Sequence, residues 1–500
     1  MLIFTELRKK NLSVRDIIKC LREEGYKLSM STVERVLMEK GFSKLSRRTF
    51  AEQGKTVDNQ IISERATPLD FKTLKPFRYD CPIAGVFFFL PYLIDSGVLD
   101  VIKRCCLPDS SAINSEQASL SMLLLKLIGG ERLSHVQEYD HEPALGLFSG
   151  LNFLPKSTYL STYSCLTSED IILDFQSQLM KKFQDTYPEF YRGNFINLDF
   201  HGIPHFGDQS QMEKVWCGAR GKAIKGANTI FAQDSESNAI LYTHADILRK
   251  DEAGEIMKFV DYWKSIKGNV KETLVFDCKL TTYDVLDKLS EEEVLFITLR
   301  KRNKKLVDDV MKIPKEDWQE CHLPIPKRKY KNVFVHVSEI KLKNCKHKFR
   351  QIIVTGHGRI QPMFIITNNL KLSIKDVLVV YAKRWHIENK FAELVSFFNL
   401  NALSSPLMIR IHFDILWTLI ADTLYKRFSQ DLRRFENERA NTLFRRFVDM
   451  PGQIIYDGKD FVLKIRKRAH TPILLGVKKL TTGFRVPWLD NRLFRVEWTA

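Results

Sequence analysis

The period of the apolar side chains changes from helical to alternating near residue 195. From Pro76 to about Asp185 the pattern is helical, and its most apolar stretch is SLSMLLLKLIGG, residues 119–130. From Phe195 the stretch FINLDFHGI alternates, with apolar side chains on one face and Asn197, Asp199 and His201 on the other. Strict alternation of this kind predicts a β-strand that is buried on one face.

Further strands are expected beyond this point from short apolar runs bounded by turn residues. NTIFAQ and NAILYTHADI flank the turn DSES, and a helix is expected over Asp251–Lys267. TLVFDC, VLFITLRK and MFIITN then read as strands, and the last of them precedes an amphipathic stretch, Val379–Phe398, that we expect to be one helix. Strands mixed with helices in this order favour an α/β layer in which helices pack on a sheet.

Three polar side chains share one edge of the helix expected over Val379–Phe398. At about 100° per residue, Tyr381, Arg384 and Glu388 fall beside an apolar stripe formed by Ile387, Phe391, Leu394 and Phe398. An ordinary Arg384–Glu388 pair, four residues apart on a helix surface, explains this arrangement without any function. The alternative is a polar site where the helix meets the sheet, and the helix pattern alone leaves both open.

The first 45 residues predict a small module of two helices, Val14–Glu24 and Thr32–Lys40. Ser13 with Asp16, and Ser31 with Glu34, have the spacing of a capping box. Two short helices with a tight connection are typical of a helix-turn-helix, which we expect over residues 1–48. The candidate DNA contacts are Thr32 and Arg35 on the second helix, and Arg47 and Arg48 in the basic tail. A helical hairpin that packs on the rest of the protein is the alternative.

The charge balance favours a polyanionic partner. The chain has 77 Lys and Arg against 60 Asp and Glu, a formal net charge of +17. Between Arg300 and Arg350 there are 16 basic and six acidic residues, together with β-like runs such as NVFVHVSEI. We expect a basic, β-rich insertion that contacts a phosphate backbone, with Arg300, Lys301 and Arg302 among the contacts. A solvated run of charge is the alternative.

No segment of the sequence predicts membrane association. The longest apolar run, IAGVFFFLPYLI at residues 83–94, is shorter than a bilayer span and contains Pro91, so we expect a buried helix. The N-terminus does not have the pattern of a signal peptide. The nine cysteines include no CxxC pair, which favours reduced thiols and gives no support for a structural zinc site.

Two aspartates are unusual because each lies in or directly after an apolar strand, Asp199 in NLDFHG and Asp277 in LVFDCK. A buried strand rarely tolerates a carboxylate without a partner or a metal, although an aspartate at a strand end often caps the next helix. If these two aspartates converge with Glu388, the three carboxylates could not all stay ionised without a cation. Two Mg²⁺ or Mn²⁺ ions bound there would support in-line displacement at a phosphodiester.

Three stretches in this order, INLDFHGIP, TLVFDCKLTTYDVL and VVYAKRWHIENKF, resemble the DDE transposases of prokaryotic insertion sequences. The similar group carries a Y-x2-R-x3-E-x6-K motif, and the resemblance covers roughly residues 77–420. It implies a ribonuclease-H-like catalytic core at residues 191–300 and 362–425, interrupted by the basic β-rich insertion at 301–361. It also implies that Asp199, Asp277 and Glu388 are the catalytic metal ligands, with Tyr381 and Arg384 near the donor-strand phosphates.

Residues 46–76 are polar and aperiodic, which predicts a linker over 49–76. We expect a helical DNA-binding or dimerisation region at 77–190 and a C-terminal region at 426–500, and the resemblance implies the function. The expected enzyme binds the terminal inverted repeats of its element in double-stranded DNA, as a homodimer in the synaptic complex. It cleaves DNA by metal-dependent hydrolysis and joins the freed 3′-OH to target DNA, in the cytoplasm of a prokaryote.

One position departs from the motif. The family's Lys, seven residues after the Glu, is Val395 here, while Lys383 and Lys390 lie nearby. We keep Lys390 as a candidate DNA contact. The departure leaves open a catalytically inactive, domesticated transposase-derived DNA-binding protein. A tyrosine recombinase, suggested by His347 and Arg350 in HKFR, would leave the three carboxylates unexplained.

Overall fold

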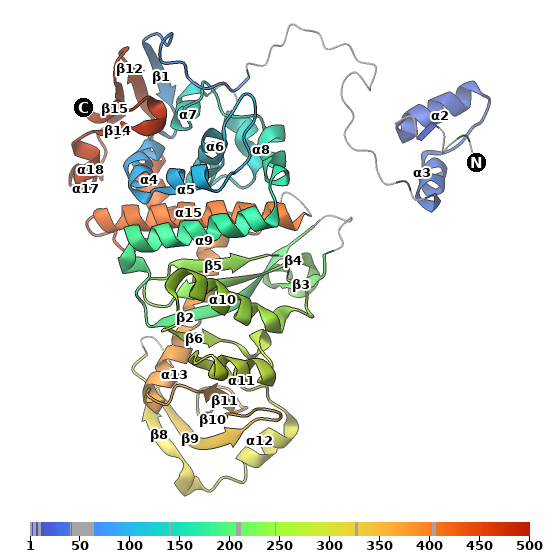
Figure 1. Cartoon of the computed structure of the whole chain (residues 1–500), viewed down its shortest axis with the longest axis vertical. Helices are drawn as coiled ribbons and strands as arrows, with labels where there is room; N and C mark the ends of the chain where they lie inside the picture. Colours follow the sequence, from blue (N-terminus) through green and yellow to red (C-terminus); the bar gives the residue numbers. More distant parts are fainter. Residues whose placement is uncertain are drawn as a thin grey trace. The chain divides into compact units, whose positions relative to one another are not determined.

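The chain forms two compact units, Met1–Glu64 and Arg65–Ala500, shown in Figure 1. The computed structural model describes residues 3, 7–8, 12–40, 42, 65–139, 142–206, 212–245, 247–325, 329–402 and 407–500. Arg47, Arg48 and the predicted linker as far as residue 64 lie outside the described residues.

The N-terminal unit contains two helices, α2 (Val14–Glu23) and α3 (Met30–Glu39). The capping box of Ser13 and Asp16 is confirmed, and Ile17, Leu21, Val33 and Leu37 form the buried core. The second predicted box is wrong, because Ser29 rather than Ser31 caps α3 by accepting the Thr32 N–H at 3.1 Å. The helix therefore begins two residues before the predicted start.

The described helices alone do not distinguish a helix-turn-helix from a helical hairpin, so the DNA-binding module stays a prediction. Arg35 is exposed, as a DNA contact requires. Thr32 is only half exposed, and its hydroxyl lies 2.8 Å from that of Ser29, within the cap of α3.

In the larger unit, the helical prediction for residues 76–185 is confirmed for most of its length. The helical elements are η1 (Ala84–Phe89), α4 (Leu90–Ser96), α5 (Val98–Arg104), α6 (Ser115–Leu127), η2 (Leu133–Tyr139), α7 (Pro143–Phe148), α8 (Ser157–Tyr163), η3 (Ser164–Leu166), α9 (Glu169–Thr186) and η4 (Pro188–Phe190). They pack around the long helix α15 (Met408–Asp431), which lies beside α9 in Figure 1. Since α15 is apolar nearly all round, it is buried as the axis of this layer.

The apolar run at residues 83–94 is buried but is not one regular helix. It forms the 3₁₀ turn η1 followed by α4, with Pro91 in the first turn of α4, and Phe87, Phe88 and Phe89 are fully buried. Among the described residues, a membrane-spanning length is reached only by joining Ala84–Ser96 to Val98–Arg104 across a 61° bend.

A five-stranded sheet joins the two ends of the larger unit, in the order β1-β12-β13-β15-β14. Its strands are β1 (Phe77–Cys81), β12 (Gly452–Tyr456), β13 (Phe461–Arg466), β14 (Phe484–Val486) and β15 (Arg492–Thr499). The helical prediction is therefore wrong at Phe77–Cys81, which pairs antiparallel with β12. Part of the predicted linker packs here too, because Phe71 lies edge-on to Tyr456 and Phe461.

Short helical elements connect these strands. They are α16 (Ala440–Leu443), the π-helical turn η9 (Phe444–Val448), α17 (Thr471–Leu475), α18 (Lys478–Thr481) and η10 (Pro487–Leu489). Apolar side chains such as Phe447, Leu474 and Leu480 fix these elements on the sheet and on the helical layer, since all three are buried.

A second sheet of ten strands carries the α/β region and confirms the mixed α/β fold. Its order is β3-β4-β2-β6-β7-β11-β10-β9-β8, with β5 paired to β4. The strands are β2 (Phe195–Pro204), β3 (Lys214–Cys217), β4 (Lys222–Asp234), β5 (Ile240–His244), β6 (Thr273–Phe276), β7 (Phe296–Leu299), β8 (Gln319–His322), β9 (Asn332–Lys341), β10 (Lys348–Thr355) and β11 (Met363–Thr367). β2, β6 and β7 run parallel, whereas the other pairs are antiparallel.

Helices cover both faces of this sheet because successive side chains of a strand point to opposite faces. Leu274 and Phe276 of β6 belong to the main core, whereas Val275 packs in a second cluster with Val377 and Leu378. The helical elements are η6 (Glu252–Gly254), α10 (Glu255–Lys267), η7 (Cys278–Leu280), α11 (Tyr283–Glu291), α12 (Lys304–Val310), η8 (Lys315–Asp317), α13 (Ile374–Lys383) and α14 (His386–Ser396).

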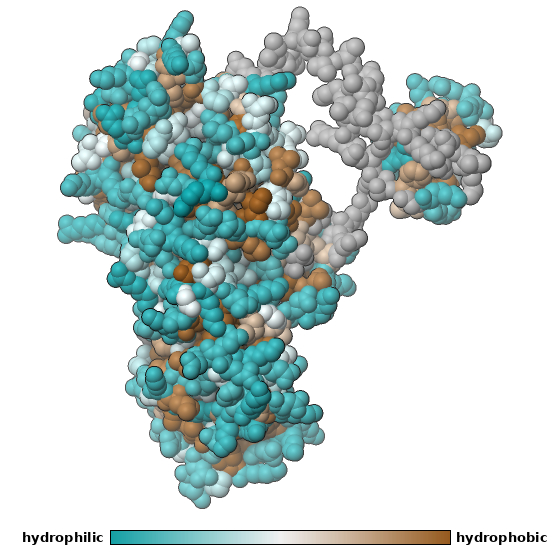
Figure 2. Space-filling model, in the orientation of Figure 1, coloured by the Kyte–Doolittle hydropathy of each residue, from teal (hydrophilic) through white to brown (hydrophobic). Residues whose placement is uncertain are grey.

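The visible face of the molecule is mostly hydrophilic, with separate apolar patches (Figure 2).

The expected single helix over Val379–Phe398 is wrong, because it is broken between α13 and α14. At the break the N–H groups of Arg384, Ile387 and Glu388 bond carbonyls three residues earlier instead of four. This tighter turn changes the direction of the chain at Arg384 and Trp385. The predicted helical wheel therefore does not apply across residues 381–388.

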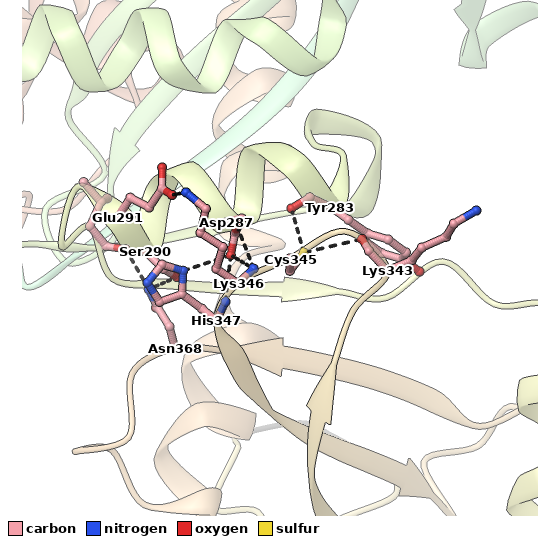
Figure 3. Close-up of polar contacts among 10 residues, drawn as sticks. Tyr283, Asp287, Ser290, Glu291, Lys343, Cys345, Lys346, His347 and Asn368 are labelled. Carbon is pink, nitrogen blue, oxygen red and sulfur yellow. Dashed lines mark hydrogen bonds and ion pairs between the residues drawn. The ribbon is translucent and has the colours of Figure 1, made fainter.

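A buried carboxylate ties α11 to the chain between β9 and β10 (Figure 3). Asp287 accepts the N–H of Lys346 at 2.9 Å and the N–H of His347 at 3.0 Å, and lies 2.8 Å from Nδ1 of His347. Burial acts to raise the pKa of Asp287. Hydrogen bonds from the His347 and Lys346 N–H groups outweigh this effect and lower the pKa to about 2. These contacts fix the β9–β10 part of the insertion on the helix that follows Asp277.

We expect Asp287→Asn to lower the free energy of unfolding by about 2 kcal/mol, since hydrogen bonds to a charged group are lost. Because the pKa is depressed on folding, the wild-type contribution is present above the ordinary value of 3.8 and disappears as the pH falls through about 2. Urea unfolding at neutral pH measures the loss. Glu291→Gln on the same helix removes only an exposed ion pair with Lys346 and should cost at most about 0.5 kcal/mol. Equal losses in the two variants would contradict the role of Asp287.

Candidate active site

The parallel pairing of β2 with β6 brings Asp199 and Asp277 together. Leu198 lies opposite Phe276 in this register, so the next residue on each strand is one of the two aspartates. Asp199 accepts the Phe200 N–H at 2.9 Å, and Asp277 caps η7 by accepting the Cys278 N–H at 2.6 Å. Asp277 thus caps the following turn, as an ordinary aspartate at a strand end does, and it also lies next to Asp199.

Arg384 connects the third carboxylate to this pair. Its Nη1 lies 2.5 Å from Oδ2 of Asp199, and its Nη2 lies 3.6 Å from Oε1 of Glu388. The Arg384 side chain is only 15% exposed, whereas that of Glu388 is 62% exposed on the first turn of α14. Arg384 also interacts electrostatically with Asp277. One guanidinium is therefore shared by all three predicted carboxylates.

The electrostatics of this cluster depend on that guanidinium. Burial raises the pKa of Asp199, and the attraction of Arg384 offsets only part of the effect. Burial acts against the charge of Arg384, but Asp199 beside it raises the pKa of the guanidinium above its usual value. Arg384 therefore stays charged, and the ionised form of Asp199 requires a cation next to it.

Tyr381 lies against the same guanidinium. The Cζ of Arg384 is 5.8 Å from the centre of the Tyr381 ring, and Tyr381 is buried in the cluster that contains Val275. Burial raises the pKa of Tyr381 despite the nearby positive charge. Its hydroxyl therefore keeps its proton near neutral pH and is a hydrogen-bond donor.

Two clefts meet at Glu388, which lines both. The first, of about 1380 Å³, lies between β2, β3, β4 and α14, and Lys279 and Val395 line it. The second, of about 1080 Å³, is bordered by Asp277, Tyr381 and Arg384 together with Arg300, Lys301 and Arg302. The three predicted basic residues thus line the same cleft as Asp277 and Glu388, although Arg300 is partly engaged by Gln351 at 2.7 Å.

The chemistry of the donors fits a hard divalent cation. Carboxylate oxygens are the ligands that Mg²⁺ and Mn²⁺ prefer, and three carboxylates already share one positive charge here. As the described side chains stand, no three His, Cys, Asp or Glu groups are close enough to hold a metal ion. Asp199, Asp277 and Glu388 are the residues that would hold such an ion, and Arg384 contacts Asp199 in this structure.

Lys390 does not fit the DNA contact expected from the sequence. It is buried, with its Nζ 2.6 Å from Asp422 of α15 and 3.1 Å from Glu393. Burial acts against its charge, but these two carboxylates raise the pKa of Lys390. The side chain faces α15 inside the protein rather than the solvent.

Two cleft residues had no individual signal in the sequence. His357 and Arg359 line the second cleft, and both come from the turn between β10 and β11. The basic composition of the insertion pointed to this region, but the strand order is what brings the turn to Asp277. The recombinase candidates are engaged elsewhere, since His347 contacts Asp287 and Arg350 donates to the Asn369 carbonyl.

The comparisons with known proteins point to one domain. Residues 194–424 match the family model described as a transposase DDE domain. No curated protein matches the chain. Among solved structures, a piggyBac transposase synaptic complex with hairpin DNA aligns with 10% identity and a TM-score of 0.37, over 75% of this chain and 82% of that one. A Mos1 transposase paired-end complex with the left transposon end aligns with 8% identity and a TM-score of 0.14, over 58% and 74%.

The family match covers the region that holds the site. It includes every strand of the ten-stranded sheet and all three carboxylates, Asp199, Asp277 and Glu388. The segment is a transposase DDE domain, and by this domain the chain is a DDE transposase, an enzyme that acts on DNA.

Proposed function

We propose that this transposase moves an insertion sequence and that Asp199, Asp277 and Glu388 are its catalytic residues. The observation that carries the proposal is that three carboxylates share one cation where two clefts meet, inside the DDE domain. The strand order supports a ribonuclease-H-like core, in which the antiparallel strands β5, β4 and β2 continue into the parallel strands β6 and β7. The Tyr381, Arg384 and Glu388 spacing supports the insertion-sequence group.

Each side chain of the site would have its own role at the scissile phosphate. When bound, two Mg²⁺ or Mn²⁺ ions would activate the attacking oxygen and stabilise the leaving oxygen, held by the three carboxylates. Arg384, once released from Asp199, would pair with a phosphate oxygen, a partner that suits its planar donors. Tyr381 would donate its hydroxyl to the donor strand. Lys301 and Arg302, both exposed in the second cleft, would hold the flanking backbone.

The partners and organisation expected from the sequence belong to this proposal. The enzyme would bind the terminal inverted repeats with its N-terminal module and pair two ends as a homodimer. Residues 77–190 would assist DNA binding or dimerisation, and residues 301–361 would form the basic insertion. It would act on DNA in the cytoplasm of a prokaryotic cell.

An amine is available near Val395, the position where the motif has Lys. Val395 is half-buried and lines the first cleft, and the exposed Lys279 lines the same cleft two residues after Asp277. We propose that Lys279 supplies the DNA contact that the signature Lys would make. The inactive alternative rested on Val395 alone and is not favoured.

Single changes of the carboxylates to amides, Asp199→Asn, Asp277→Asn or Glu388→Gln, should each lower metal-dependent end cleavage at least about a thousandfold. Binding of the element end should survive, because the amides keep the shape of the site. Labelled end DNA measures both, by cleavage assay and by gel shift. Asp309→Asn, on the surface of α12, is the control and should cleave normally. Cleavage above a tenth of normal in any of the three variants would disprove the assignment.

Removing the guanidinium should make the metal site easier to fill. We expect Arg384→Gln to bind Mn²⁺ about tenfold more tightly without DNA, since the amide no longer competes for Asp199. Electron paramagnetic resonance of free Mn²⁺ measures this affinity independently of activity. Arg384→Lys, which keeps the charge, and Arg492→Gln, in the five-stranded sheet, should bind Mn²⁺ like the wild type. Unchanged or weaker Mn²⁺ binding by Arg384→Gln would refute the competition.

A further inference from the structure

A two-stranded ribbon, residues 214–225, borders the first cleft. None of its residues has a role in the proposed catalytic site. In this β3–β4 ribbon Lys214 lies opposite Lys225, Trp216 opposite Ala223, and Cys217 opposite Lys222. Val215 and Cys217 point inward and are buried, so Lys214 and Trp216 point outward. The ribbon therefore has an apolar inner face and an outer face of cations around one aromatic ring.

Large aromatic side chains are exposed on the outer face of the ribbon and beside it. Trp216 is 66% exposed, and Phe206, beside the ribbon, is 60% exposed. The guanidinium of Arg220 lies 4.7 Å from the centre of the Phe206 ring. Large exposed aromatic side chains that are surrounded by cations are typical of surfaces that contact a partner.

Positive side chains share one face of the ribbon. Lys214 lies directly opposite Lys225 across the two strands. Lys214, Arg220 and Lys222 are exposed, and within the described part of the chain no ion pair joins them to a carboxylate. An anionic partner would pair with these three exposed cations, which argues for a polyanion rather than a neutral surface.

The ribbon is packed tightly on the strand that carries Asp199. A Cβ atom at Gly202, three residues after Asp199 on β2, would lie 2.9 Å from Cβ of Val215. Gly226 of β4 approaches the same valine closely. Because these glycines leave no space between the strands, the position of the ribbon relative to the carboxylates is fixed. Trp216 lines the same cleft as Glu388 and Lys279.

We propose that the β3–β4 ribbon is a DNA-binding element that lies in a groove of the duplex beside the cleaved phosphate. A two-stranded ribbon fits the major groove, and Lys214, Arg220 and Lys222 would contact phosphates on its sides. Trp216 would pack against the sugars and base edges. The inference rests on the proposed function, since it places duplex DNA in the cleft that Glu388 lines.

The test measures DNA binding in full-length protein carrying Asp199→Asn, so that cleavage does not interfere. The probe is a duplex with the inverted repeat that borders the reading frame, and its dissociation constant is measured across a range of salt concentrations. For Lys214→Gln with Lys222→Gln, the slope of log affinity against log salt should fall by about 2, because two phosphate contacts are lost. Trp216→Ala should weaken binding at least about fivefold with an unchanged salt slope.

The control removes the same charge elsewhere. Lys459→Gln with Lys467→Gln changes two exposed lysines of the five-stranded sheet and should leave the slope unchanged. Lys214→Arg with Lys222→Arg should retain the wild-type slope. A slope equal to that of the control pair would overturn the proposal, and so would a loss of dimer without a change in DNA binding, which would assign the ribbon to a protein partner. Because cleavage is not measured, the result is independent of the catalytic assignment.

Discussion

The parallel pairing of β2 with β6 determines where every group of the site can lie. Leu198 faces Phe276 in this register, so two aspartates that are far apart in the sequence become neighbours. Burial on both faces of β6 holds the register, since its alternating side chains enter two different cores. A shift by one residue would exchange those faces, and therefore the packing that stabilises the sheet also fixes the distance between the two carboxylates.

Neighbouring carboxylates in a partly buried position repel each other, and the break between α13 and α14 provides the compensating charge. The tighter turn directs Arg384 onto Asp199 while Glu388 begins the next helix and stays exposed. The guanidinium offsets part of this negative charge in the free protein. We infer that the same side chain turns to a DNA phosphate when the substrate and the cations arrive, so that one residue would serve two states of the enzyme.

Much of this arrangement could be predicted from local patterns. The alternation in FINLDFHGI, the apolar run before Asp277, and the spacing of Tyr381, Arg384 and Glu388 all depend on neighbours in the sequence. The predictions that were wrong failed because they depend on contacts between residues far apart in the sequence. Phe77–Cys81 forms a strand because it pairs with residues 452–456 at the other end of the chain. Lys390 is buried because α14 packs on α15, where Asp422 receives it. Neither partner is visible from the local sequence, and Arg384 at the helix break likewise contacts Asp199 on a distant strand.

The most direct test of the account is to find where the protein binds its metal. Fe²⁺ takes oxygen ligands much as Mg²⁺ does, and with ascorbate and peroxide it generates radicals that cut the polypeptide near the bound ion. If the three carboxylates form one metal site, cuts will occur close to Asp199, Asp277 and Glu388 in one molecule, and excess Mg²⁺ or Asp199→Asn will suppress them. Cuts confined to other segments, or cuts at these three that Asp199→Asn does not reduce, would contradict a single site formed by the three carboxylates.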